Sequence, residues 1–120
     1  MGKSVMMSTQ HASRILPLTI LGQNGAVAGV PELGEGFGQA TVANGAAGVY
    51  AVTFTNAFAR VPVIVATAVV SGTGVSLFPV IYGVTAAGFT LEVTDDAGTL
   101  TEADAHVVVF GTDSADLGGV

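Results

Sequence analysis

The chain contains no cysteine and no tryptophan among its 120 residues. Without cysteine it can form no disulfide, no thiolate nucleophile and no cysteine-ligated zinc site. Histidine is scarce as well, since His11 and His106 are the only two. A catalytic site needs several convergent reactive groups, and this chain has few to offer. The sequence therefore predicts a binding or structural protein and not an enzyme.

Charged residues are the next shortage. They make up 10% of the chain, while half of the residues are hydrophobic. A typical soluble domain is about 25% charged. A domain of this size leaves roughly a third of its unfolded-chain surface exposed to water. Alanine, glycine, serine and threonine must cover most of that surface, which suits burial against other protein subunits.

Cations are the rarest charged residues. Lys3, Arg14 and Arg60 stand against nine acids, all of which lie from Glu32 onward, and the net charge is −6. An acidic body with one arginine cannot neutralise a phosphate backbone, so nucleic acid is excluded as a partner. The acids could instead face an electropositive protein surface, or they could serve solubility alone. Both interpretations stay open.

A long uncharged stretch runs from residue 61 to residue 91 and could reach across a bilayer. It is broken by Pro62, by Ser71-Gly72-Thr73-Gly74 and by Pro79. Such backbone breaks are costly where they face lipid. We therefore expect no membrane partner.

Hydrophobic residues alternate with a period of two, which is typical of half-buried antiparallel strands. Residues 49–55 and 89–94 are the clearest cases. Residues 61–70 and 75–84 are more continuously apolar and predict strands covered on both faces, either by a second sheet or by another subunit. A last strand is expected over residues 105–110. Turn signals separate these segments, at residues 43–45, 55–57, 71–74, 86–88 and 95–98.

Six or seven short strands at this spacing predict an all-β fold, namely a sandwich, a jelly roll or a partly closed barrel. The expected form is an antiparallel β-sandwich or jelly-roll-like domain over residues 36–120. Residues 1–35 are expected to form an extended N-terminal arm and loop. Such an arm becomes ordered when a partner supplies a sheet edge or a groove. The alternative is an N-terminal edge strand of the same domain.

Three groups of residues invite a chemical interpretation. His106 shares a strand face with Asp104, but no serine stands on a nucleophile turn. Gly34, Gly36 and Gly38 lack the following helix that a phosphate site needs. The acidic segment from Asp95 to Asp104 could bind calcium, although it lacks EF-hand spacing, and that question stays open. We assign no catalytic, cofactor-binding or metal-binding residue.

Glycan binding is weakly supported because there is no tryptophan to stack on a sugar ring. Tyr50 and Tyr82 lie in strand contexts, where both are expected to pack.

The order of the body segments resembles that of the short head decoration (cement) proteins of tailed bacteriophages. The element around Phe58 and Pro62 is also shared with phage tail-fibre tip domains and the H-type lectin-like fold. The resemblance covers about residues 37–114. It is carried by residues 48–54, Phe58 with residues 61–63, residues 84–91, and residues 104–110 with Asp113-Ser114.

The resemblance implies a homotrimer on the capsid surface of the virion, made in the host cytoplasm, with the major capsid protein as its partner. It would clamp neighbouring coat subunits and would need no cofactor. We expect the contact to the capsid or to another subunit to involve Arg14, Ile15, Leu16 and Leu18. The alternative function is a trimeric tail-fibre tip or lectin-like domain that recognises a receptor glycan.

Overall fold

The structure is a computed structural model that describes residues 13–27, 29–70 and 75–113. These residues form strands and turns without a helix, and none of their segments is a helix long and apolar enough to cross a bilayer. The predicted all-β class is therefore confirmed. The strands are β1 (Ser13–Leu21), β2 (Glu32–Leu33), β3 (Ala40–Ala46), β4 (Val49–Phe54), β5 (Val63–Val69), β6 (Leu77–Thr85), β7 (Gly88–Asp95) and β8 (Asp104–Thr112).

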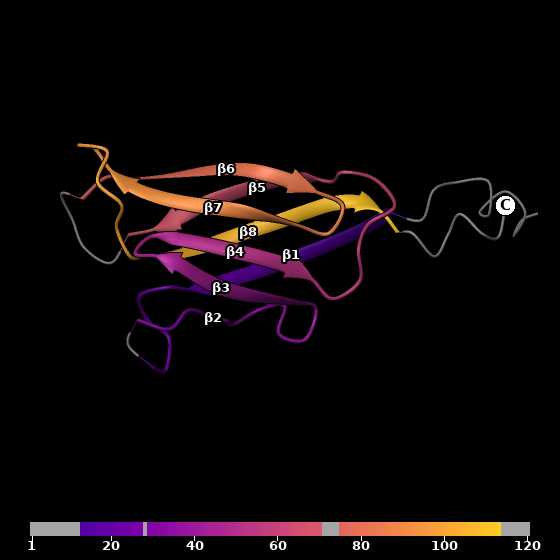
Figure 1. The fold of residues 1–120 in the computed structure, drawn as a ribbon, viewed down its shortest axis with the longest axis horizontal. Coiled ribbons are helices and arrows are strands. Elements are labelled where there is room, and N and C mark those ends of the chain that lie inside the picture. The colour runs from indigo at the N-terminus through magenta and orange to yellow at the C-terminus, as the bar shows by residue number, and fades with distance from the viewer. Residues whose placement is uncertain (1–12, 28, 71–74, 114–120) are drawn as a thin grey trace, which may run out of the picture.

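The strands form two four-stranded sheets in two layers (Figure 1). Sheet A has the order β2-β1-β8-β5, and sheet B has the order β3-β4-β7-β6. Every pairing between neighbouring strands is antiparallel. The arrangement is the predicted antiparallel β-sandwich.

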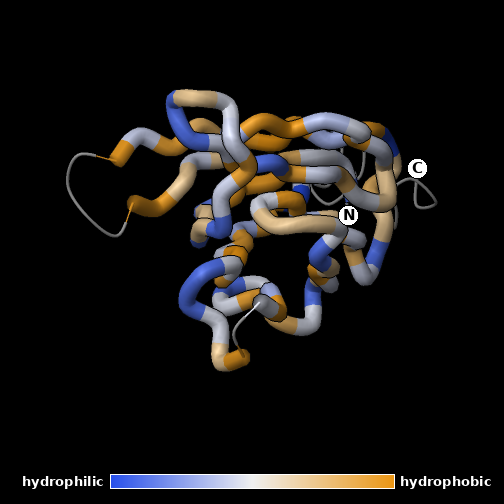
Figure 2. Tube along the Cα trace, turned by 60° about the vertical axis from the view of Figure 1, so that its left-hand side comes forward, coloured by the Kyte–Doolittle hydropathy of each residue, from blue (hydrophilic) through white to orange (hydrophobic). Residues whose placement is uncertain are grey.

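The hydrophobic core fills the space between the sheets. As the alternation predicts, β4 turns Tyr50, Val52 and Phe54 inward and β7 turns Phe89, Leu91 and Val93 inward. Hydrophobic and polar residues alternate along the strands in Figure 2. Sheet A contributes a matching set from β1 and β8, made up of Leu16, Leu18, Ile20, Ala105, Val107 and Val109.

The division into an arm over residues 1–35 and a body over residues 36–120 does not match this fold. Within the described residues, β1 pairs with β8 along its whole length, from Ser13 opposite Thr112 to Leu21 opposite Asp104. It is not an edge strand either, because β2 pairs with it on the other side. β1 belongs to the sandwich because its inward side chains complete the core. Residues 1–12 lie outside the described part of the chain.

The apolar strands β5 and β6 are each covered on one face only. The inward side chains of β5 pack against the core, but Val63 and Val65 on its other face are exposed. On β6, Val80 and Tyr82 are exposed in the same way. The second sheet therefore accounts for one face of each strand, and the prediction that another subunit covers the second face stays open.

Candidate interaction surface

The outer face of sheet A is an apolar surface that this chain leaves uncovered. Strands β1, β8 and β5 lie side by side, and their register aligns the outward side chains into rows. Two successive rows are entirely apolar. The first row consists of Ile15, Phe110 and Val63, and the second consists of Pro17, Val108 and Val65.

All six side chains except the half-buried Val108 are exposed. Ile15 and Val63 are each 64% exposed, Val65 is 58% exposed and Phe110 is 42% exposed. The next row is polar and consists of Thr19, His106 and Thr67. A contiguous uncharged apolar face of this kind marks a protein contact site more often than a surface that stays in water. We call the six apolar side chains of the two rows the outer A face.

Sheet B treats its outer face differently. On β3, β4 and β7 its outward positions carry mainly threonine, alanine and Glu92, whereas the edge strand β6 exposes Phe78, Val80 and Tyr82. This contrast between the outer faces of the two sheets arises from the order of apolar and polar residues along their strands. Strands β4 and β7 alternate apolar with polar residues, whereas β5 is apolar at nearly every position. On sheet A the exposed apolar residues therefore span three neighbouring strands, whereas on sheet B the large ones lie on the edge strand β6.

The predicted contact residues are divided by this fold. Ile15 lies on the outer A face. Leu16 and Leu18 do not reach a surface, since they are 5% and 2% exposed and point into the core. Their assignment as partner contacts is therefore wrong, because adjacent residues of a strand face opposite sides of its sheet.

Arg14 also faces inward, at the end of the sandwich. Its Nη1 donates a hydrogen bond to the backbone carbonyl of Asn56 at 2.6 Å. The guanidinium carbon lies 4.2 Å from the ring centroid of Phe58, within the range of a cation–π contact. Arg14 thus fastens β1 to the loop after β4 and is placed to hold the fold together.

Asp104 is committed to the loop after β1 and not to His106. Its carboxylate accepts hydrogen bonds from the backbone amides of Gln23 and Asn24 at 2.9 and 3.0 Å, and from Asn24 Nδ2 at 2.7 Å. Burial raises the pKa of Asp104, but these hydrogen bonds and one from Gly22 outweigh it and hold the pKa below 3.8. No hydrogen bond joins Asp104 to His106, so the pair that the sequence suggested does not form.

Tyr50 stands at the centre of a second polar group. Its hydroxyl donates to Glu102 Oε1 at 3.0 Å and accepts from the Ala103 amide at 3.1 Å. Glu102 Oε1 also accepts from the Gly48 amide at 2.8 Å. Burial raises the pKa of Tyr50 to about 12, so the hydroxyl stays protonated at neutral pH. This group joins the start of β8 to sheet B and has a structural role.

The acidic side chains of residues 95–104 do not gather at one site. The Asp95 carboxylate accepts from the amides of Ala97 and Thr99 within its own turn. Glu102 and Asp104 are held in the two separate groups described above. Across residues 13–27, 29–70 and 75–113, no three histidine or acidic side chains gather as a metal ion would require.

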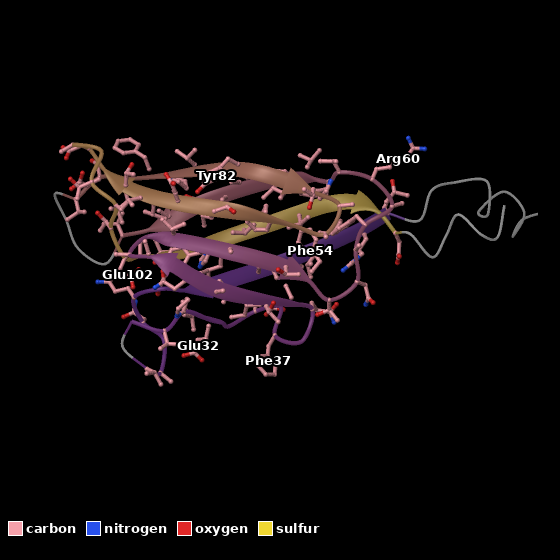
Figure 3. The ribbon with its side chains drawn as sticks, viewed as in Figure 1. Glu32, Phe37, Phe54, Arg60, Tyr82 and Glu102 are labelled. Atoms are coloured by element: carbon pink, nitrogen blue, oxygen red, sulfur yellow. The ribbon has the colours of Figure 1, made fainter. Side chains whose placement is uncertain are left out.

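Two exposed aromatic side chains were missed by the sequence analysis. Phe37 is 84% exposed at the rim of a groove of about 360 Å³ between β2 and β3, and Figure 3 shows it pointing away from the sandwich. Tyr82 was expected to pack, but it is exposed on β6 and donates to Glu92 Oε2 at 3.0 Å. The sequence held no signal for Phe37, whose exposure depends on how the loop between β2 and β3 turns.

Comparison with protein families, with curated proteins and with solved structures finds no match to this chain.

Proposed function

We propose that this chain is a structural protein that decorates the surface of an assembled viral head and stabilises contacts between its coat subunits. The outer A face carries the proposal, because it offers apolar contact area without any group that would perform chemistry. The order of the body segments, which resembles that of phage head decoration proteins, supports the same function.

The mechanism is thermodynamic linkage. A protein that binds the assembled shell and not its separated subunits stabilises the shell by mass action. At a free concentration a hundred times the dissociation constant, each occupied site adds about 2.7 kcal/mol. A small contact per copy is sufficient when many copies bind the same lattice.

The experiment is to count this chain in purified particles against the major coat protein, by quantitative mass spectrometry. Copies in a simple ratio to the coat protein, all removable without loss of the shell, support decoration. A few copies per particle would place the chain at the tail, and complete absence from particles would overturn the viral assignment. The temperature at which the particles release their packaged genome should fall when the chain is removed.

A second candidate function is glycan recognition by a tail-fibre tip or lectin-like domain. The observation that favours it is the exposed Tyr82 ring on the outer side of sheet B, which donates a hydrogen bond to Glu92, with Phe78 exposed further along the same strand. An aromatic ring next to a carboxylate is a feature of sugar sites, and aromatic rings offer rigid contact area. Saturation-transfer NMR with a panel of bacterial surface glycans tests it. A signal lost in Tyr82→Ala but kept in Tyr82→Phe would favour this function over decoration.

A further inference from the structure

We infer that the free edge of β5 pairs with β5 of a second copy of this chain, so that sheet A continues across two protomers. This inference goes beyond the proposed function and does not depend on a viral partner.

The four edge strands of the sandwich are protected to different degrees. β2 is only two residues long, and β6 carries Pro79 and a shift of register between Tyr82 and Thr85. β3 has a register shift between Asn44 and Ala46. Short length, proline and bulges are the devices by which proteins block pairing at an edge. Three of the four edges therefore carry such a device.

β5 carries none. Its seven residues, Val-Ile-Val-Ala-Thr-Ala-Val, contain no charge, proline or glycine. Its ladder with β8 runs without a shift from Val63 opposite Phe110 to Val69 opposite Asp104. Among the described strands β8 is its hydrogen-bonded neighbour, so every second residue of β5 turns its amide and carbonyl toward the open side. An edge this long, regular and apolar is a template for another strand.

The core beneath β5 also lacks full cover. Ile64, Ala66 and Ala68 point inward and pack against the core, yet all three are only partly buried. The corresponding inward residues of β8, which has a strand on each side, are fully buried. A further strand beside β5 would supply the missing neighbour.

The distribution of charge selects a second copy in antiparallel orientation as the occupant. The two described cations, Arg14 and Arg60, lie at the end of the sandwich where β5 begins, and Figure 3 shows Arg60 there and Glu102 at the opposite end. At that opposite end Val69 pairs with Asp104. Antiparallel pairing therefore sets the arginine end of each copy beside the acidic end of the other. A parallel pairing would set like charges together.

One register uses the whole edge. When the two-fold axis passes midway between the Ala66 residues of the two copies, all seven residues of β5 pair. Val65 of each copy then lies opposite Thr67 of the other. Such an isologous contact closes after two copies, because the continued sheet then ends on both sides at the two-residue strand β2. It yields a dimer, whereas the resemblance to decoration proteins implies a trimer, so the mass distinguishes them.

The pairing also enlarges the outer A face. Three strands about 4.8 Å apart and about 30 Å long give the whole outer side of sheet A, of which the outer A face is a part, a flat area of about 400 Å² per copy. A stable interface takes about 800 Å² from each partner. The two-fold axis stands perpendicular to the sheet, so the outer sides of both copies of sheet A point the same way and their areas add to about 800 Å². The dimer therefore presents a contact face of the usual size.

The first experiment measures the mass of the full chain by sedimentation velocity over a range of concentrations. We expect a dimer. The double variants Val65→Lys/Thr67→Lys and Val65→Glu/Thr67→Glu place like charges opposite each other across the two-fold axis, and each should be monomeric alone. An equimolar mixture should recover the dimer, because lysine then faces glutamate. Circular dichroism checks that both variants fold.

Ile15→Lys is the matched control, because Ile15 lies on the same face but on β1, away from the β5 edge. It should leave the dimer intact. If Ile15→Lys abolishes self-association as the double variants do, the copies meet through their faces and the inference is wrong. A wild-type chain that stays monomeric at all concentrations, or forms a trimer, also overturns it. Neither result bears on the count of this chain in particles.

A second variant reads the register without adding charge. Val65→Cys introduces the chain's single thiol at an exposed position, and in this register the two copies of residue 65 are diagonal neighbours across the two-fold axis, about 7–8 Å apart. A short bis-maleimide should link two copies in high yield at micromolar concentration. Thr53→Cys, on the outer face of sheet B, is the control and should give little linkage. Equal yields from the two variants would contradict the pairing.

Discussion

The Asn24 side chain donates a hydrogen bond to Asp104 Oδ2 at 2.7 Å and joins the loop after β1 to the first residue of β8. The backbone amides of Gln23 and Asn24 bind the other carboxylate oxygen. Because Asp104 lies opposite Leu21 at the end of the β1–β8 ladder, the three hydrogen bonds seal the ladder where it ends. One carboxylate thereby fixes both the chain's path after β1 and the register of the two central strands of sheet A.

Replacing Asp104 should therefore destabilise the whole sandwich. Asp104→Ala leaves two backbone amides and one side-chain amide without their acceptor. A hydrogen bond to a charged group contributes about 1.5–3 kcal/mol net, and because water can reach these part-buried amides once the carboxylate is removed, we expect a total loss of about 2 kcal/mol. The measurement is urea unfolding followed by circular dichroism. Asp96→Ala, at an exposed turn, is the control and should change the free energy of unfolding by less than about 0.5 kcal/mol.

The same carboxylate predicts a dependence of stability on acid. The pKa of Asp104 is lower in the folded chain than its ordinary value of 3.8, so the folded state favours the ionised form. Its contribution is complete above pH 4 and is lost as the pH falls through the folded pKa. The difference in unfolding free energy between the wild type and Asp104→Asn should thus shrink steadily below pH 4. A difference that stays constant down to pH 2 would contradict this account.

Sequence patterns predicted β4 and β7 well because each has one apolar and one polar face. They failed for β1, where Ile15 and Pro17 make the outer positions apolar as well. Proline is also unusual inside a sheet. The structure accommodates Pro17 because β2 pairs only with Ile20 and Leu21, which leaves the β2 side of the strand free beside Pro17. That exception depends on the length of a different strand, so a local pattern could not reveal it.

The candidate surface was partly predictable. Low charge and the apolar run in residues 61–70 predicted a strand covered on both faces, and the second sheet covers one face of β5 while the cover of the other face stays a prediction. Which residues share that face depends on the register that sets Ile15 opposite Phe110 and Phe110 opposite Val63. The register joins segments about 95 residues apart, roughly the whole domain, and follows from core packing and from contacts such as Asn24 with Asp104. For this reason the sequence grouped Ile15 with Leu16 and Leu18, its neighbours in the chain, and not with its neighbours in space.

The buried hydroxyl of Tyr50 predicts how the stability of the fold changes at high pH. Tyr50→Phe removes the donor to Glu102 and the acceptor of the Ala103 amide, and we expect it to cost about 1–2 kcal/mol. The folded pKa is raised to about 12 from an ordinary 10, so this tyrosine contributes fully below pH 10 and its contribution is lost as the pH rises through 12. Ultraviolet titration of the folded Tyr82→Phe variant, in which Tyr50 is the only tyrosine, should show ionisation only near pH 12. Ionisation near pH 10 in folded protein would show that the hydroxyl is not buried.

A substitution at Gly88 tests how closely β7 packs beside β4 in sheet B. A Cβ atom at this position would collide with the backbone carbonyl oxygen of Val52 on β4, which cannot move without disturbing the ladder. We expect Gly88→Ala to cost more than about 2 kcal/mol through the forced shift of backbone. Gly45→Ala is the matched control, because a Cβ there meets only the Val49 side chain at 3.7 Å. Thermal unfolding of both variants should lower the midpoint for Gly88→Ala alone.

Charge on the outer A face should separate binding from folding. Ile15→Lys replaces an exposed side chain that contributes little to the core, so the free energy of unfolding should change by less than about 0.5 kcal/mol. Binding to particles that lack this chain should fall at least tenfold, because a lysine placed in an apolar contact must lose its water. Thr53→Lys puts the same charge on the outer face of sheet B and should bind like the wild type. Since Ile15→Lys is expected to remain dimeric, loss of particle binding without loss of the dimer would assign the face to the partner and the β5 edge to the second copy. Equal binding by both variants would exclude the outer A face as the contact.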